Sequence, residues 1–351
     1  MVGRPVPAVP VGSPLTPSTT DPSSPLSHLL RDPVPFATID VGTNTAQLLV
    51  VESNGRSLCR LHTAERFVRL GEGVDASGRV SEAAQDRLLT TLRDHKQAAL
   101  EQGAERIVAV GTSALRDATN RQVVLDRVHR TLGLSLNVLS GETEAAWSFA
   151  AACSALDDGT GPCLVVDVGG GSTELVAGQD PAAHRPNYPA AIVDRTSLDI
   201  GCVRLTERCF DDQPPSSHAV EEATRIIDEA LDATALTVDS APILVGTAGT
   251  ATALALVHLG PESEWDALHG GGFVLRHDHV QHWRRKLLRL SIDEIRALHP
   301  EAMAGRADVF TVGVLLLDRV LSHFDRDHLR VSPYELRHGL ALRVLAQNGM
   351  K

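Results

Sequence analysis

Two short segments of the chain carry the same pattern of acid, glycine and hydroxyl residues, at 40–45 and at 167–173. Each follows an apolar run that predicts a buried strand, and each precedes a second run of β-forming residues. A strand, a tight turn and a returning strand make a hairpin. Glycine in the turn lets backbone N–H groups face one point, and small side chains leave room there for phosphate oxygens. Two such hairpin tips predict a duplicated fold whose halves close on one phosphate-bearing ligand.

The second tip has the richer chemistry. Asp167 stands at a strand end, where a carboxylate can hold a divalent cation directly or through water, and Glu174 supplies a second carboxylate. An ordinary turn is the alternative, but three consecutive glycines are costly for that purpose. We expect the backbone N–H groups and hydroxyls of this tip to surround a phosphate. The residues concerned are Gly169, Gly170, Gly171, Ser172 and Thr173.

In the first tip, Asn44 and Thr45 are the expected phosphate donors, and Asp40 is the expected counterpart of Asp167 as a metal ligand. A third small-residue loop, at 246–252, ends a predicted buried strand and opens a helix. Helix N-termini bind anions, so Gly249 and Thr250 are further candidates for phosphate binding.

Two charged segments complete the candidates. Arg116 follows a predicted buried strand, where open α/β sheets place ligand groups and where an arginine can clamp a phosphate. A salt bridge from Arg116 to Asp117 or Glu65 is the alternative. The segment 140–145 places acids in the first turn of a predicted helix, where the helix dipole favours them. One of these acids can be a general base for an attacking water, although a plain helix start explains them equally well.

The predicted elements repeat their order. From Phe36 the order is three strands, a helix capped by Ser81, then strand, helix and strand. The pattern restarts at 141 with a helix and the second hairpin. We therefore expect one domain at 36–140 and a second at 141–333, with the phosphate-binding cleft between them. A last helix at about 334–351 is expected to pack back on the first domain, and the Pro-, Ser- and Thr-rich residues 1–35 are expected to form a disordered tail.

The composition narrows the class of protein. With 351 residues and 43% apolar residues, the chain is long enough for two globular domains. A net charge of −11 argues against a general nucleic-acid binder. We find neither an apolar run of transmembrane length nor the apolar segment of a signal peptide, so no membrane partner is expected. The five cysteines are typical of reduced thiols in a cytoplasmic protein. The histidines at 269, 277, 279 and 282 match no common metal site.

In this order the motifs resemble the exopolyphosphatase/guanosine pentaphosphate phosphohydrolase (Ppx/GppA) family of the actin–sugar kinase–Hsp70 superfamily. The resemblance covers about 36–345 and implies a duplicated actin-like (ribonuclease H-like) α/β fold. It also implies hydrolysis of a terminal phosphoanhydride with Mg²⁺ or Mn²⁺, and it suggests a homodimer. The segments that carry it are Ile39–Thr45, Gly111–Arg116, Ser140–Ala145, Val166–Leu175, Gly201–Leu205, Gly246–Thr250, Gly305–Val309, Val331–Ser332 and Leu336–Gly339.

The resemblance also implies roles for single residues. Glu144 matches the catalytic base, and Asp167 and Glu174 match the acids associated with magnesium. Two departures concern donors: Thr45 stands where the family usually has Ser, and Gln47 where it has a basic residue. A third departure is Thr143, which replaces a frequent acid and leaves Glu144 as the better candidate base. The residues that match positions near bound phosphate are Asn44, Arg116, Gly170 and Ser172.

Inorganic polyphosphate is the expected substrate, and guanosine pentaphosphate (pppGpp) is the alternative, since the family hydrolyses both. A kinase of the same superfamily would carry a carbohydrate-binding segment, which we do not find in the sequence. A non-catalytic phosphate or nucleotide sensor has no need of Glu144, Asp167 and Glu174 together. The additional C-terminal helical domains of long family members are missing from this sequence, so we expect a short, two-domain form.

Overall fold

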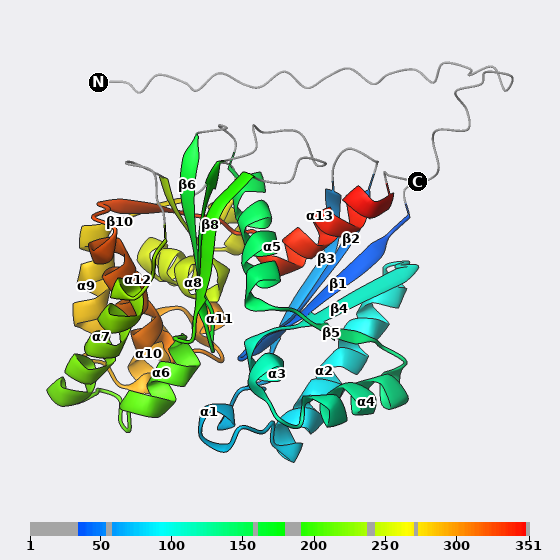
Figure 1. Cartoon of the computed structure of the whole chain (residues 1–351), viewed down its shortest axis with the longest axis horizontal. Coiled ribbons are helices and arrows are strands. Elements are labelled where there is room, and N and C mark those ends of the chain that lie inside the picture. The colour runs from blue at the N-terminus through cyan, green and yellow to red at the C-terminus, as the bar shows by residue number, and fades with distance from the viewer. Residues whose placement is uncertain are drawn as a thin grey trace, which may run out of the picture. The chain divides into compact units, whose positions relative to one another are not determined.

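Two mixed β-sheets form the framework of the described part of the chain (Figure 1). The structure is a computed structural model, and it describes residues 34–53, 58–156, 161–179, 191–236, 243–269 and 273–348. All of these residues belong to one compact unit. The tail expected at 1–35 lies outside the described residues, except for its last two positions.

The first sheet has five strands in the order β3-β2-β1-β4-β5. β1 (Phe36–Val41) and β2 (Thr45–Ser53) form the predicted antiparallel hairpin. β2 also pairs antiparallel with β3 (Leu58–Phe67). β1 runs parallel to β4 (Arg106–Gly111), which runs parallel to β5 (Leu136–Val138). The first tip and the residues after β4 therefore meet at the carboxyl edge of this sheet.

The second sheet repeats this order and adds one edge strand. β6 and β7 form the second hairpin, with Asp167 opposite Glu174. β8, β7, β6, β9 and β11 occupy the places of β3, β2, β1, β4 and β5, with the same strand directions. The repeated topology confirms the duplicated fold, and it agrees with the actin-like fold that the resemblance implies. The strands are β6 (Pro162–Val168), β7 (Thr173–Gln179), β8 (Ala191–Leu198), β9 (Ile243–Thr247), β10 (Phe273–Arg276) and β11 (His328–Val331).

Helices cover both faces of the first sheet (Figure 1). Alternate residues of β2 point to opposite faces: Leu48 and Val50 pack in the core with α2 (Glu82–Glu101) and α4 (Arg121–Leu132). Leu49 and Val51 pack instead against α13 (Leu336–Asn348). The last helix thus packs on the first sheet. The domain borders at 140 and 333 stay a prediction.

α13 also packs against α5 (Gly141–Ser154), and Figure 1 shows the two helices side by side. A Cβ atom at Gly339 would overlap the carbonyl oxygen of Trp147 in α5. Glycine therefore lets the two helix backbones touch. This contact ties α5, which begins beside the second tip, to the first sheet.

The larger hydrophobic core lies on one face of the second sheet, and α7, α8 and α12 contribute to it. No helix was expected from the sequence at α6, and no strand at β10. Among the described helices, none is long and apolar enough to cross a membrane. The remaining helices are α1 (Val74–Ser77), α3 (Ser113–Asp117), α6 (Cys202–Cys209), α7 (Ser217–Asp232), α8 (Ala248–Leu259), α9 (His277–Leu287), α10 (Ile292–Leu298), α11 (Pro300–Met303), α12 (Phe310–His323) and a 3-10 turn at Trp265–Leu268.

Candidate active site

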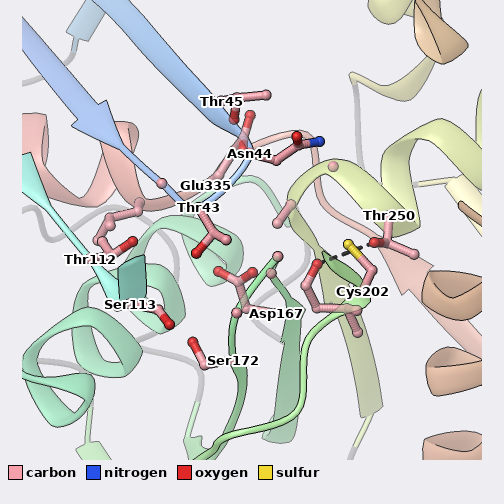
Figure 2. A pocket seen from close by; sticks show the side chains of 18 of the residues that line it. Thr43, Asn44, Thr45, Thr112, Ser113, Asp167, Ser172, Cys202, Thr250 and Glu335 are labelled. Carbon is pink, nitrogen blue, oxygen red and sulfur yellow. Dashed lines mark hydrogen bonds between the residues drawn. The ribbon is translucent and has the colours of Figure 1, made fainter. Parts of the chain in front are cut away.

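A cavity of about 110 Å³ lies where the tips of the two hairpins meet (Figure 2). The first sheet contributes the turn between β1 and β2 and the residues after β4. The second sheet contributes the turn between β6 and β7, and α8 contributes its first residues. Figure 2 shows Asp167 in the middle of this lining. The predicted site residues that line the cavity are Asp40, Asn44, Thr45, Glu144, Asp167, Gly169, Gly170, Gly171, Ser172, Gly249 and Thr250.

Three predicted residues, Arg116, Thr173 and Glu174, are not among those that line this cavity. The hydroxyl of Thr173 donates to the carbonyl oxygen of Ile200 at 2.6 Å. Glu174 is buried and accepts a hydrogen bond from the Ser197 hydroxyl at 2.7 Å. The roles given to these residues stay predictions.

The glycine tip between β6 and β7 is oriented by the start of α6. The amides of Cys202 and Val203 donate to the carbonyl oxygens of Gly169 and Gly170, at 2.9 and 2.8 Å. The C=O and N–H groups of one trans peptide point in opposite directions. The N–H groups that follow these carbonyls therefore point away from α6, towards the cavity that the tip lines, and this arrangement suits an anion.

The first tip packs directly on the second. A Cβ atom at Gly170 would lie 2.9 Å from Thr43 Cβ, and one at Gly171 would lie 2.9 Å from Thr43 Oγ1 and would overlap the Ser113 hydroxyl. Glycine at these two positions therefore leaves room for the side chains of Thr43 and Ser113. Thr43 and Ser113, which the sequence analysis did not select, add two hydroxyl groups to the cavity.

Four carboxylates line the cavity: Asp40, Glu144, Asp167 and Glu335. Burial raises the pKa of Asp167 to about 7, and the negative charge of Glu144 adds to the effect. Burial also raises the pKa of Asp40 well above its usual range, with the charges of Glu144 and Glu335 adding. The Oδ1 atom of Asp40 is buried without a hydrogen-bond partner. Buried negative charge with an unpartnered oxygen fits a divalent cation.

Within the part of the chain that the structure describes, no three His, Cys, Asp or Glu side chains are arranged to hold a metal ion by themselves. Mg²⁺ is usually bound by one or two carboxylates, with water and substrate phosphates in the other positions. Asp40 and Asp167 fit that mode of binding. Among the four histidines that match no common metal site, His277 contacts the buried Asp318 at 2.8 Å.

Glu144 lies in the first turn of α5 and is held there by an arginine. The Nη1 atom of Arg116 donates to Glu144 Oε2 at 2.8 Å and to the carbonyl oxygen of Leu139 at 3.1 Å. The salt-bridge partner of Arg116 is therefore Glu144, rather than the Asp117 or Glu65 considered from the sequence. Burial raises the pKa of Glu144, although Arg116 opposes this rise. A fixed carboxylate with a raised pKa suits a general base.

The loop that opens α8 makes room for Arg306, which lines the cavity. Ala248 adopts a φ of 61°, in the left-handed region that residues other than glycine seldom occupy. A Cβ atom at Gly249 would lie 3.1 Å from Cζ of Arg306, so glycine makes room for this guanidinium. The Thr250 hydroxyl donates to the carbonyl oxygen of Val168 at 3.2 Å, which ties the loop to the second hairpin. The sequence analysis gave Arg306 no role.

Arg306 begins a chain of hydrogen bonds that passes through Glu65, Gln47, Glu335 and Arg337. Arg306 donates to Glu65 at 2.6 Å, and Gln47 donates to Glu65 at 2.9 Å. Gln47 also donates to Glu335 at 3.1 Å, and Arg337 donates to Glu335 at 3.0 Å. Arg306 and Glu335 line both the first cavity and a second one of about 920 Å³. The chain therefore lies at the junction of the two cavities.

The repeated topology and the carboxylate-lined cavity define a duplicated α/β protein with an acidic site where its two halves meet. The chain belongs to the Ppx/GppA phosphatase family, which it matches over residues 49–348. Exopolyphosphatase 2 of Mycobacterium tuberculosis is 36% identical over 325 residues, which cover 88% of this chain and 98% of that protein.

Two further relatives agree with this assignment. The guanosine-5'-triphosphate,3'-diphosphate pyrophosphatase of Vibrio atlanticus is 30% identical over 91% of this chain and 61% of its own length. The crystal structure of the Aquifex aeolicus member of the Ppx/GppA family is similar with a TM-score of 0.73 at 28% identity, covering 90% of this chain and 98% of that one. The family predicted from the motifs is confirmed.

Proposed function

We propose that this protein is an exopolyphosphatase that hydrolyses the terminal phosphoanhydride of inorganic polyphosphate and releases orthophosphate. One observation carries the proposal: Glu144 lines the same cavity as the N–H-rich glycine tip and the carboxylates of Asp40 and Asp167. A candidate base, an anion site and a cation site thus meet where one terminal phosphoryl group would sit. The match to an exopolyphosphatase over nearly its whole length supports the substrate class.

In the proposed reaction a water molecule attacks the terminal phosphorus in line with the bridging oxygen. Glu144 accepts the proton of this water, and Arg116 holds the carboxylate in place. The bond between phosphorus and the bridging oxygen breaks, and the shortened polyphosphate leaves with the bonding electrons. The N–H groups of the glycine tip and the hydroxyls of Thr43, Ser113 and Ser172 stabilise the negative charge on the phosphoryl oxygens.

Asp40 and Asp167 would hold the divalent cation, for which we propose Mg²⁺, with Mn²⁺ as a substitute. Glu174, which lies opposite Asp167 in the hairpin but does not line the cavity, stays a predicted metal-associated acid. When bound, the cation would neutralise charge on the phosphate oxygens.

Hydrolysis of pppGpp is the second candidate, and the larger cavity favours it. That cavity has room for a nucleoside, since it measures about 920 Å³ and carries Phe67 and Trp265 in its lining. Its charges are mixed, with four arginines against five acids, so it is not a purely basic path for a polyanion. A kinase or a phosphate sensor is less well supported, because the curated relatives described above are named as hydrolases. The homodimer and the cytoplasmic location stay predictions.

The test is orthophosphate release, with Mg²⁺, from long-chain polyphosphate and from pppGpp in parallel. We expect fast release from polyphosphate and slow release from pppGpp. Release from pppGpp alone would assign the enzyme to the second candidate function. Release from neither substrate would contradict the proposal, and ATP would then be the ligand to test.

A further inference from the structure

The side chain of Arg204 in α6 donates three hydrogen bonds beside the cavity. Arg204 itself is not among the residues that line the cavity. Its Nε atom donates to the carbonyl oxygen of Gly171 at 2.7 Å. Its Nη1 atom donates to Asp75 of α1 at 2.8 Å, and its Nη2 atom donates to Asp117 of α3. The Arg204 side chain itself is only 13% exposed.

The contact with Gly171 completes the orientation of the glycine tip. The amides of Cys202 and Val203 bind the carbonyls of Gly169 and Gly170, and Arg204 binds the third carbonyl. With all three carbonyls bound on the α6 side, the N–H groups that follow them are directed to the other side, where a phosphate would lie. The Arg204 side chain therefore fixes the orientation of the last of these N–H groups, the one that follows the Gly171 carbonyl.

The contact with Asp117 reaches the other half of the molecule. Asp117 is the neighbour of Arg116 in α3, and Arg116 is the residue that holds Glu144. A single guanidinium thus joins the tip that would bind the phosphoryl group to the short helix that places the candidate base. Arginine suits this task because its planar group carries five N–H donors in a rigid fork, whereas the ammonium of lysine is a point charge.

We propose that Arg204 is a positioning residue for the hydrolytic site, which holds the glycine tip and α3 in fixed positions relative to each other. It acts through Gly171 and Asp117 and does not touch the substrate. The expected effect on turnover rests on the proposed function, but the expected effect on the orientation of the glycine tip does not. Loss of Arg204 lowers turnover more than substrate affinity, because it displaces donors that act on the reacting phosphoryl group.

Arg208 provides a matched control. It lies one turn further along α6 and also binds Asp75, at 2.6 Å, but it has no contact with Gly171 or Asp117 among those that the structure gives. It is 41% exposed, and ion pairs of this kind contribute little to stability. Arg208→Gln therefore removes a similar charge from the same helix without releasing the tip.

The experiment compares Arg204→Gln, Arg204→Lys and Arg208→Gln by steady-state kinetics on long-chain polyphosphate, thermal unfolding and amide hydrogen exchange of the segment 168–173. For Arg204→Gln we expect kcat to fall by roughly tenfold to a hundredfold, with a much smaller change in KM and faster exchange in the tip. Arg204→Lys should recover only part of kcat. Arg208→Gln should stay within about twofold of wild type.

The proposal is overturned if Arg204→Gln keeps wild-type turnover and tip exchange, or if Arg208→Gln loses kcat to the same extent. It is also overturned if Arg204→Gln only lowers the melting temperature while kcat per folded molecule is unchanged, since that is a structural role. Should Arg204→Gln fail to fold, Arg204→Lys decides by the same readouts. If wild type hydrolyses neither polyphosphate nor pppGpp, the proposed function fails, and amide exchange alone still tests whether Arg204 fixes the tip.

Discussion

At the scale of single residues, the ion pair between Glu144 and Arg116 sets the pH range in which the proposed base can act. Burial raises the pKa of Glu144, and the guanidinium of Arg116, 2.8 Å away, opposes that rise. The balance keeps the carboxylate available to accept a proton while holding it in one orientation. The arginine thus tunes the base as well as placing it.

Replacing Arg116 by methionine should move the acid limb of the pH–rate profile to higher pH. Without the guanidinium, the pKa of Glu144 rises further, so the base stays protonated up to a higher pH. A shift of at least about one pH unit is expected, as for a carboxylate that loses an adjacent cation. The measurement is kcat/KM against pH.

Arg195→Met serves as the control for that profile, because the ion pair of Arg195 within the described part of the chain is with the exposed Glu142, at 3.2 Å. Its profile should match that of wild type. An acid limb of Arg116→Met that moves to lower pH, or that does not move, would show that Glu144 is not the group responsible for it.

At the scale of elements, the packing of α6 against the glycine tip is the contact on which the anion site depends. Gly201 precedes α6, and a Cβ atom there would lie 2.5 Å from the carbonyl carbon of Gly170. Its φ of −141° is ordinary for any residue, so glycine is required here for the close approach alone. Backbone faces backbone at this point, and no side chain can move aside to make room.

Gly201→Ala should therefore push the tip from its place. We expect a loss of stability of about 1–3 kcal/mol from overpacking. We also expect a fall in kcat of at least about tenfold from misplaced donors. Urea unfolding and polyphosphate hydrolysis measure the two effects.

Gly246→Ala separates the effect on the tip from plain destabilisation, because its added methyl would meet the side chains of Leu329 and Ala251, neither of which lines the cavity. This variant should lose stability while keeping its turnover. Equal losses of kcat in both variants would contradict the role of the tip packing.

Elements with strong local signals were predictable from the sequence. The two hairpins have apolar strands on both sides of a glycine turn, and Ser81 and Ser140 accept hydrogen bonds from the amides three residues on, as N-caps do. α6 was missed because it is short and its helical character depends on the tip that it contacts. The domain duplication followed from the repeated tips.

From the sequence, only those site residues were predictable whose positions follow from the second hairpin itself. The tip glycines and Asp167 line the cavity because the hairpin itself places them there. Arg306 and Glu335 reach the same cavity from segments far away in the chain, and nothing local to those segments indicates the meeting. Arg116 was selected as a phosphate clamp, but only the tertiary structure shows that its partner is Glu144.

At the scale of the whole molecule, buried carboxyls make stability depend on pH and on cations. Burial raises the pKa of Asp40, Asp167 and Glu174, and neighbouring carboxylates add to this rise. Each carboxyl therefore holds its proton more tightly in the folded chain than in the unfolded chain. The pKa of Asp167 is near 3.8 in the unfolded chain and about 7 in the folded chain. Between these two pH values the unfolded chain binds fewer protons than the folded chain. The contribution of these groups to stability thus falls as the pH rises through this window.

For metal-free protein, we predict that the free energy of unfolding decreases between about pH 5 and about pH 7, by up to about 1.4 kcal/mol per pH unit for each carboxyl. Urea unfolding in the presence of a chelator measures it. Asp167→Asn should make the decrease less steep, and added Mg²⁺ should restore stability at the upper end. A stability that rises through this range would refute the assignment of raised pKa values to these groups.

The most direct test of the account is the turnover of Glu144→Gln on long-chain polyphosphate, with binding of the same polyphosphate measured separately. Because the amide cannot accept the proton of the attacking water, the account predicts a loss of kcat of at least about a hundredfold, with binding retained. Glu142→Gln, in the same helical turn but exposed, should remain active. Near-normal turnover in a folded Glu144→Gln protein would contradict the assignment of Glu144 as the base.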